Sequence, residues 1–253
     1  MLRNRDIESA DNLVLELWRE VISQSHLRSR NDKVANALFH FMVRVANSWR
    51  SIRTLRNNTT DEQGFTIDAG TLLRAMYDAY FQAAYLVSEP AKCTERADDY
   101  FEFEHVERHK SVQRMISHSN WVAERLKAST KRAEGEKENL SQFERVKKRF
   151  ATKGQSNGIR NHWYKGNLLD LAHSMKKGDE YDTFLAIFNG CVHTSAFASK
   201  HGPPVSAEYV LEMASVISAK VAQLNVVRNH IQLNENHQHL LKVLCRDSEK
   251  SEL

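Results

Sequence analysis

The sequence predicts a single all-α domain, an antiparallel bundle of long helices, on three observations. Only nine glycines and three prolines occur in 253 residues, too few for the many turns of a sandwich or barrel. Hydrophobic residues make up 41% of the chain, enough for a core, and they recur with a helical period. No proline interrupts the chain between Pro90 and Pro203, so long helices can form there.

The first three helices are expected at 7–25, 32–56 and 69–87. The first two each carry one apolar stripe, and the turn-forming residues 57–60 end the second. The helix at 69–87 is apolar on nearly every side, which is typical of a helix at the centre of a bundle. Pro90 should end this helix, and because of its apolar surface we expect the helix at the centre of the bundle.

Long helices at 91–128 and 138–151 should follow. Three glycines then bracket the segment 159–164, which reads Ile-Arg-Asn-His-Trp-Tyr. The remaining helices are expected at 168–175, 180–199, 207–232 and 237–245, before a charged tail at 246–253. The core-facing stripe of the helix at 207–232 is expected to comprise Val210, Met213, Ile217, Leu224 and Val227.

Positive charge gathers in one segment of the chain. The net charge is +4, and residues 127–153 contain nine basic residues against four acidic ones. Such a stripe can neutralise RNA phosphates, and the candidate nucleic-acid-binding residues are Arg145, Lys147, Lys148 and Arg149. The alternative is a solvated helix face with Glu/Lys pairs.

Two charged residues interrupt the apolar surface of the helix at 69–87. Arg74 and Asp78 are four residues apart and therefore share a face, which continues through Phe81 and Tyr85. Burying either charge alone would be costly, so both must find polar partners. They form either a structural ion pair or part of a polar site inside the bundle.

A histidine on the helix at 180–199 has a similar setting. His193 lies within an otherwise apolar run, and steps of four, three, four and four residues place one face of this helix at Asp182, Ala186, Asn189, His193 and Phe197. Histidine can act as a general acid or base near neutral pH, or it can be a hydrogen-bonded core residue. With Tyr181 as a hydroxyl partner, the candidate catalytic cluster is Arg74, Asp78, His193 and Tyr181.

Metal and cofactor sites are not expected. Glu102-x-x-His105 matches half of a carboxylate-bridged di-iron pattern, but the chain has no second copy of it, and Val106 breaks a His-Glu-x-x-His match through His109. A solvated helix face is the alternative for these histidines. Gly-rich phosphate loops and the Gly-x-Ser-x-Gly elbow are also missing from the sequence.

The N-terminus, the length of the apolar runs and the cysteines indicate where the protein is located. The N-terminus lacks the pattern of a signal or transit peptide, and no apolar run approaches the length of a membrane span. Three widely spaced cysteines suit neither a disulfide framework nor a zinc site. We therefore expect a cytoplasmic protein without membrane contact. The expected partner is RNA, through the basic segment, or a second copy of the chain if the protein is an interaction module.

Short motifs across about residues 35–200 resemble an uncharacterised family of bacterial all-helical proteins. They are Leu72-Leu73-Arg74-x-x-x-Asp78, His162-Trp163-Tyr164, Tyr181-x-x-Phe184 and Cys191-Val192-His193. The family more often has Glu at position 78 and another residue at position 191. The resemblance implies a helical bundle of unknown function.

That family is in turn similar in outline to the HEPN group, helical bundles often found in toxin and phage-defence systems as metal-independent ribonucleases. This similarity implies an RNA-directed effector. The single-helix Arg-to-His motif of those enzymes is absent here, so an Arg74–His193 pairing across two helices would have to replace it. The alternative function is a non-enzymatic helical interaction module, in which the same cluster only holds the bundle together.

Overall fold

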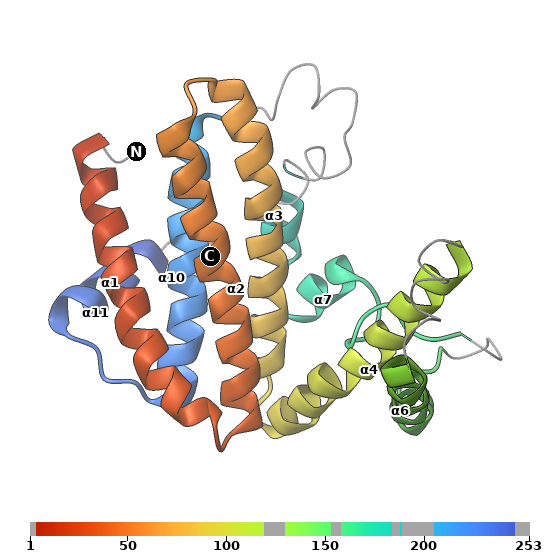
Figure 1. Cartoon of the computed structure of the whole chain (residues 1–253). Coiled ribbons are helices and arrows are strands. Elements are labelled where there is room, and N and C mark those ends of the chain that lie inside the picture. The colour runs from red at the N-terminus through yellow and green to blue at the C-terminus, as the bar shows by residue number, and fades with distance from the viewer. Residues whose placement is uncertain (1–3, 119–129, 153–157, 184–187, 189–204, 246–253) are drawn as a thin grey trace. The chain divides into compact units, whose positions relative to one another are not determined.

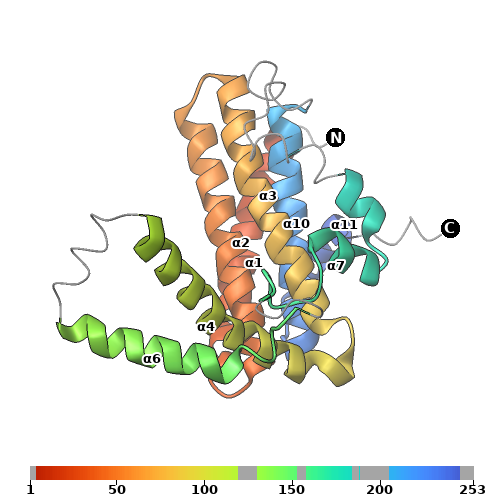
Figure 2. The ribbon, with the colours of Figure 1, turned by 90° about the vertical axis from the view of Figure 1, so that its right-hand side faces the viewer.

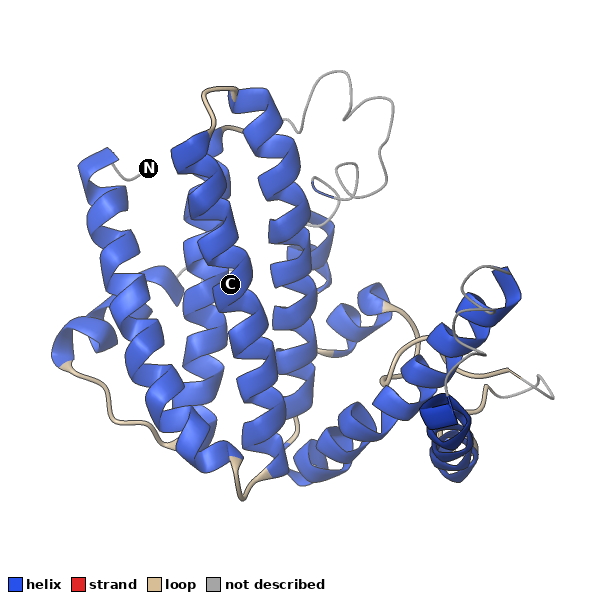
Figure 3. Cartoon of the chain, in the orientation of Figure 1, coloured by secondary structure: helices blue, strands red, loops and turns tan. Residues whose placement is uncertain are grey.

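The computed structural model describes residues 4–118, 130–152, 158–183, 188 and 205–245. These residues are predominantly helical, and no strand occurs among them, which confirms the all-α prediction (Figure 3). The elements are α1 (Asn4–Ser29), α2 (Lys33–Asn58), α3 (Glu62–Val87), the 3-10 helix η1 (Pro90–Lys92), α4 (Cys93–His118), α6 (Thr130–Val146), α7 (Leu168–Ser174), α10 (Ala207–Asn229) and α11 (Glu235–Cys245).

The chain forms two compact units. Unit 1 comprises Met1–Thr94 and Leu168–Leu253, and unit 2 comprises Glu95–Asn167. The expectation of a single domain stays a prediction. The end of the helix expected at 91–128 and most of the helix expected at 180–199 lie outside the described residues.

Unit 1 is a bundle in which α1, α2, α3 and α10 run side by side (Figures 1 and 2). Short connections join α1 to α2 and α2 to α3, so these neighbours are antiparallel. Within this bundle α10 packs against α1, α2, α3 and α11, and α3 packs against α2, α10 and α7. Half of the residues of α3 are buried, so this helix forms part of the core as expected. Its place at the centre of the bundle stays a prediction.

Small side chains recur on α10. Its buried residues include Ala214, Ser218 and Ala222 beside larger apolar side chains. The expected stripe is corrected at one end, since Val227 is 66% exposed.

The length and composition of α10 meet the requirement for a membrane span, contrary to the sequence estimate. Core helices of soluble proteins pass the same test, and more than half of the apolar window is buried within the fold. The contacts of α10 with four other helices account for its apolar character. The absence of membrane contact stays a prediction.

Aspartate side chains cap two of the long helices. Asp32 precedes α2 and accepts hydrogen bonds from the backbone N–H groups of Val34 and Ala35 at 2.8 and 3.1 Å. Asp61 caps α3 in the same way and accepts from Gln63 N–H at 3.1 Å. Because of this cap α3 begins seven residues earlier than 69, and the two added turns stay helical despite Gly64.

Unit 2 is built around α4 and the C-terminal part of α6. The ring of His109 stacks on Phe143, and the ring of Phe103 packs edge-on against Phe150, which follows α6. The earlier residue of α4, Phe103, contacts the later partner, Phe150, and the later residue, His109, contacts the earlier partner, Phe143. The two segments are therefore antiparallel. This arrangement agrees with the predicted antiparallel packing.

Candidate functional site

The first predicted pair is formed in unit 1. Arg74 and Asp78 lie one turn apart on α3, and Arg74 Nη1 donates a hydrogen bond to Asp78 Oδ1. The two side chains are 16% and 32% exposed. The pair is therefore largely removed from water, yet solvent still reaches the carboxylate.

Tyr181 lies against the same helix. Its ring contacts the ring of Phe81, with centroids 6.0 Å apart, and Phe81 itself is fully buried. Phe81 is three residues after Asp78, so Tyr181 packs on the side of α3 that carries the ion pair. His193 lies outside the described residues, and its place in this cluster stays a prediction.

Beside Tyr181 stands an ion pair that the sequence did not reveal. Lys220 Nζ of α10 donates to Glu180 Oε1 at 2.5 Å, and the two side chains are only 12% and 14% exposed. Lys177 Nζ lies 3.7 Å from Glu180 Oε2. Both ammonium groups also lie over the ring of Tyr80, at 5.3 and 5.7 Å from its centroid. This cluster joins α10 and α3 to the chain around Tyr181.

Two phenol groups face this cluster. Burial, with the Glu180 carboxylate as the second cause, raises the pKa of Tyr77 and Tyr80 far above their ordinary value of 10.0. Both phenols therefore stay protonated at any physiological pH. They can donate hydrogen bonds but cannot act as bases.

In unit 2, Arg149 is held by acidic side chains. Its Nε donates to Asp99 Oδ1, and its Nη1 donates to Glu102 Oε2 at 2.8 Å. Its Nη2 donates to the carbonyl oxygen of Glu95 at 3.3 Å. The guanidinium that was expected to contact RNA is thus neutralised by α4.

The other three basic candidates differ from one another. Lys147 forms an ion pair with Glu144, and Arg145 Nη2 lies 3.5 Å from His105 Nε2. Arg145 and Lys148 are exposed. The segment therefore resembles the solvated, internally paired face more than a fully open basic stripe.

His105 and His109 of α4 contact side chains of α6. The ring of His109 stacks on Phe143 with centroids 3.9 Å apart, while His105 faces Arg145. Among the described residues, no three His, Cys, Asp or Glu side chains gather as a metal site would require. Burial outweighs the attraction of Glu144 and lowers the pKa of His109 below its ordinary value of 6.5.

Acidification should weaken unit 2 through His109. Because the folded state resists protonation of this ring, its contribution to stability is present above pH 6.5 and is lost as the pH falls through the lowered pKa. Denaturant unfolding at pH 7.5 and pH 5 measures the loss. His109→Phe keeps the ring stack without the proton, so this variant should lose less stability than wild type on acidification, and equal losses would contradict the assignment.

A buried histidine joins α1 to α11. His237 Nδ1 lies 2.5 Å from Glu20 Oε2, and Asn234 Nδ2 donates to the same oxygen at 3.1 Å. Asn234 Oδ1 also accepts from the backbone N–H of His237, as a helix cap does. The group fixes α11 on the bundle, and its long sequence separation hid it from pattern analysis.

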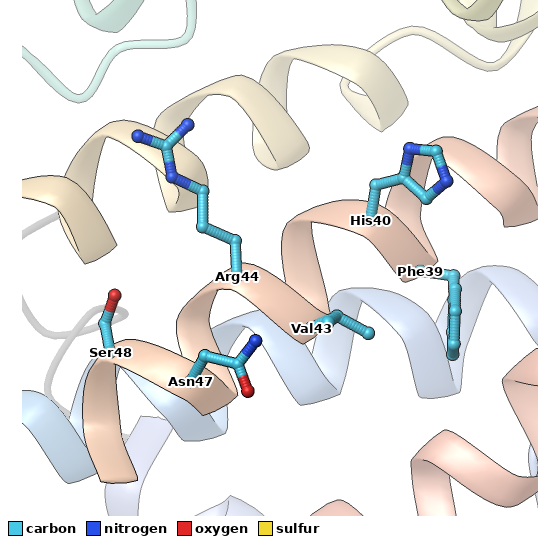
Figure 4. A pocket seen from close by; sticks show the side chains of 6 residues that line it. All are labelled: Phe39, His40, Val43, Arg44, Asn47 and Ser48. Atoms are coloured by element: carbon cyan, nitrogen blue, oxygen red, sulfur yellow. The ribbon is translucent and has the colours of Figure 1, made fainter. Parts of the chain in front are cut away.

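An open pocket of about 500 Å³ lies along α2. Figure 4 shows its described lining, which consists of two rows at helical spacing: Phe39, Val43 and Asn47, and His40, Arg44 and Ser48. None of these six residues is acidic, so the surface suits a small anionic group better than a cation.

Comparison with known proteins adds one finding. The model of a family described as a family of unknown function (DUF5677) matches residues 35–202, about two thirds of the chain. No curated protein and no solved structure matches the chain. The matched range includes α3, α4, α6, α7 and the chain around Tyr181.

Proposed function

We propose that this chain, which belongs to the DUF5677 family of unknown function, is an effector of the toxin or phage-defence kind that acts on RNA. The active site in this proposal is the polar face of α3. The observation that carries it is the Arg74–Asp78 pair, because a guanidinium that is 16% exposed acts more strongly on a phosphate than one in bulk water. Tyr181, whose ring contacts Phe81 further along α3, is the proposed hydroxyl donor.

The chemistry fits cleavage by the neighbouring ribose hydroxyl. A base removes the proton from the 2′-OH, the 2′-oxygen bonds to phosphorus, and the P–O5′ bond breaks as O5′ takes up a proton. Arg74 would stabilise the charge on the phosphorane, Asp78 would orient Arg74, and Tyr181 would donate a hydrogen bond to a phosphate oxygen. The base in this scheme is His193, assigned from the sequence alone.

RNA binding would also use unit 2. Arg145 and Lys148 are exposed and can contact phosphates, while Arg149 supports the local fold through Asp99 and Glu102. Binding should therefore weaken as salt rises, but with a shallow dependence, because few free cations take part.

The test is incubation of the purified chain with a labelled single-stranded RNA in the presence of a chelator. We expect fragments that end in 2′,3′-cyclic phosphate and 5′-hydroxyl groups, as the proposed bond changes require. Intact RNA after prolonged incubation at high enzyme concentration would contradict the proposal.

The second candidate is a non-enzymatic interaction module, with a second copy of the chain as one partner. The specific observation in its favour is the neutralisation of Arg149 by two carboxylates, which leaves less positive charge for RNA than the sequence suggested. Light scattering over a concentration series tests for a dimer. A monomer that cleaves RNA would eliminate this candidate.

A further inference from the structure

The irregular segment 159–164 of unit 2 is held by several hydrogen bonds from charged side chains. Lys110 Nζ on α4 donates to the carbonyl oxygens of Ile159 and Arg160 at 3.2 and 2.7 Å, and to Asn161 Oδ1 at 3.1 Å. All three donors of one ammonium group thus serve a single turn. Burial, followed by the charge of Arg114, lowers the pKa of Lys110, as expected of a cation used inside the fold.

Arg160 fixes the same turn from the other side. Its Nη2 donates to the carbonyl oxygen of Arg149 at 3.0 Å, its Nη1 donates to that of Trp163 at 3.4 Å, and its guanidinium lies over the ring of Phe150. The backbone N–H of Arg160 also donates to Phe150 O at 2.9 Å. The turn is therefore tied to the end of the basic segment.

This turn presents an aromatic surface. The rings of His162 and Tyr164 stack in parallel, with centroids 5.0 Å apart and planes 5° apart. Tyr164 is only 4% exposed, whereas His162 is exposed. The ring of Tyr164 therefore lies parallel to the imidazole, and His162 as a residue keeps its contact with solvent.

The surroundings of the imidazole favour its neutral form. Burial of part of the ring and the nearby charge of Lys110 lower the pKa of His162 below 6.5. A neutral ring held rigidly on a second ring forms a stacking platform, on which a planar base loses little further freedom.

Two exposed lysines belong to the chain segments that meet at this turn. Lys165 follows Tyr164, and Lys148 precedes Arg149, whose carbonyl oxygen binds Arg160. Stacking rings beside lysines are the combination with which proteins bind unpaired nucleotides.

We propose that the 159–164 turn is a base-stacking site for single-stranded RNA, with His162 stacking on one unpaired base and Lys148 and Lys165 contacting the adjacent phosphates. The inference rests on the RNA-directed function proposed above. The proposed stacking site lies in unit 2, whereas the proposed cleavage site lies in unit 1.

The experiment measures binding of the full chain to a fluorescent 2′-O-methyl oligouridine, which cannot be cut through its 2′-oxygen. A strand of equal length and charge without bases is the second probe. His162→Ala should lower the affinity for the oligouridine about tenfold, as expected for the loss of one stacked base, and should leave the affinity for the baseless strand unchanged. His162→Phe should restore binding, and His239→Ala, at an exposed histidine of α11, is the matched control.

Each other outcome overturns the inference in a distinct way. If wild type binds oligouridine and His162→Ala binds it equally well, the stacking site is wrong while the RNA-directed function stands. If His162→Ala loses affinity for both probes to the same extent, the substitution has damaged the fold or a phosphate contact, and the assignment of stacking is wrong. If wild type binds neither probe, the stacking site and the proposed function both fail.

Discussion

Replacing Arg74 by alanine is expected to lower the rate of RNA cleavage by about a hundredfold or more, the usual effect of removing one charge-stabilising donor from an active site. The loss should appear in the chemical step, because Arg74 is assigned to the phosphorane rather than to the bound RNA. Single-turnover cleavage of a labelled RNA at saturating enzyme measures it. Arg74→Lys should recover part of the rate, since lysine keeps the charge but lacks the planar fork.

A loss of folding stability must be excluded as the cause of slower cleavage by Arg74→Ala. Asp78 is 32% exposed, so water can solvate its carboxylate once Arg74 is gone, and the loss of stability should be about 1 kcal/mol or less. Arg56→Ala is the control, because Arg56 forms another ion pair of unit 1, with Glu208, which is more exposed than the Arg74–Asp78 pair. Cleavage by Arg74→Ala at the wild-type rate would show that the pair is only structural.

Replacing Lys220 by methionine is expected to destabilise unit 1 by about 3 kcal/mol or more, the usual effect of leaving one charge of a buried pair without its partner. The Glu180 carboxylate is 14% exposed and would lose its closest cation, at 2.5 Å. Lys177, at 3.7 Å, would compensate in part. Denaturant unfolding of the purified variant measures the change.

A double variant separates the charge effect from packing. Lys220→Met combined with Glu180→Leu removes both charges, and it should regain most of the lost stability because no buried charge then lacks a partner. If Lys220→Met alone unfolds at the wild-type denaturant concentration, Glu180 is better solvated than its burial indicates, and the cluster does not hold the chain around Tyr181.

Local relationships could be predicted from the sequence. Arg74 and Asp78 meet because side chains four residues apart on a helix are neighbours, whatever the rest of the fold does. The helix ends near Asp32, Asn229 and Cys245 were predicted within a few residues, since capping and periodicity are also local signals.

Contacts between distant segments could not be predicted. Glu180 and Lys220 are forty residues apart, and nothing in either local pattern reports the other. The same holds for Arg149, which looked like a free cation until α4 brought Asp99 and Glu102 to it.

The most direct test of the central claim compares wild type with His193→Ala in bacteria, following growth and the integrity of total RNA, together with the thermal midpoint of each purified protein. The account predicts that wild type arrests growth and degrades RNA, and that His193→Ala does neither while melting at the same temperature. It is contradicted if neither protein affects RNA and His193→Ala melts several degrees lower, because the histidine would then serve the fold alone.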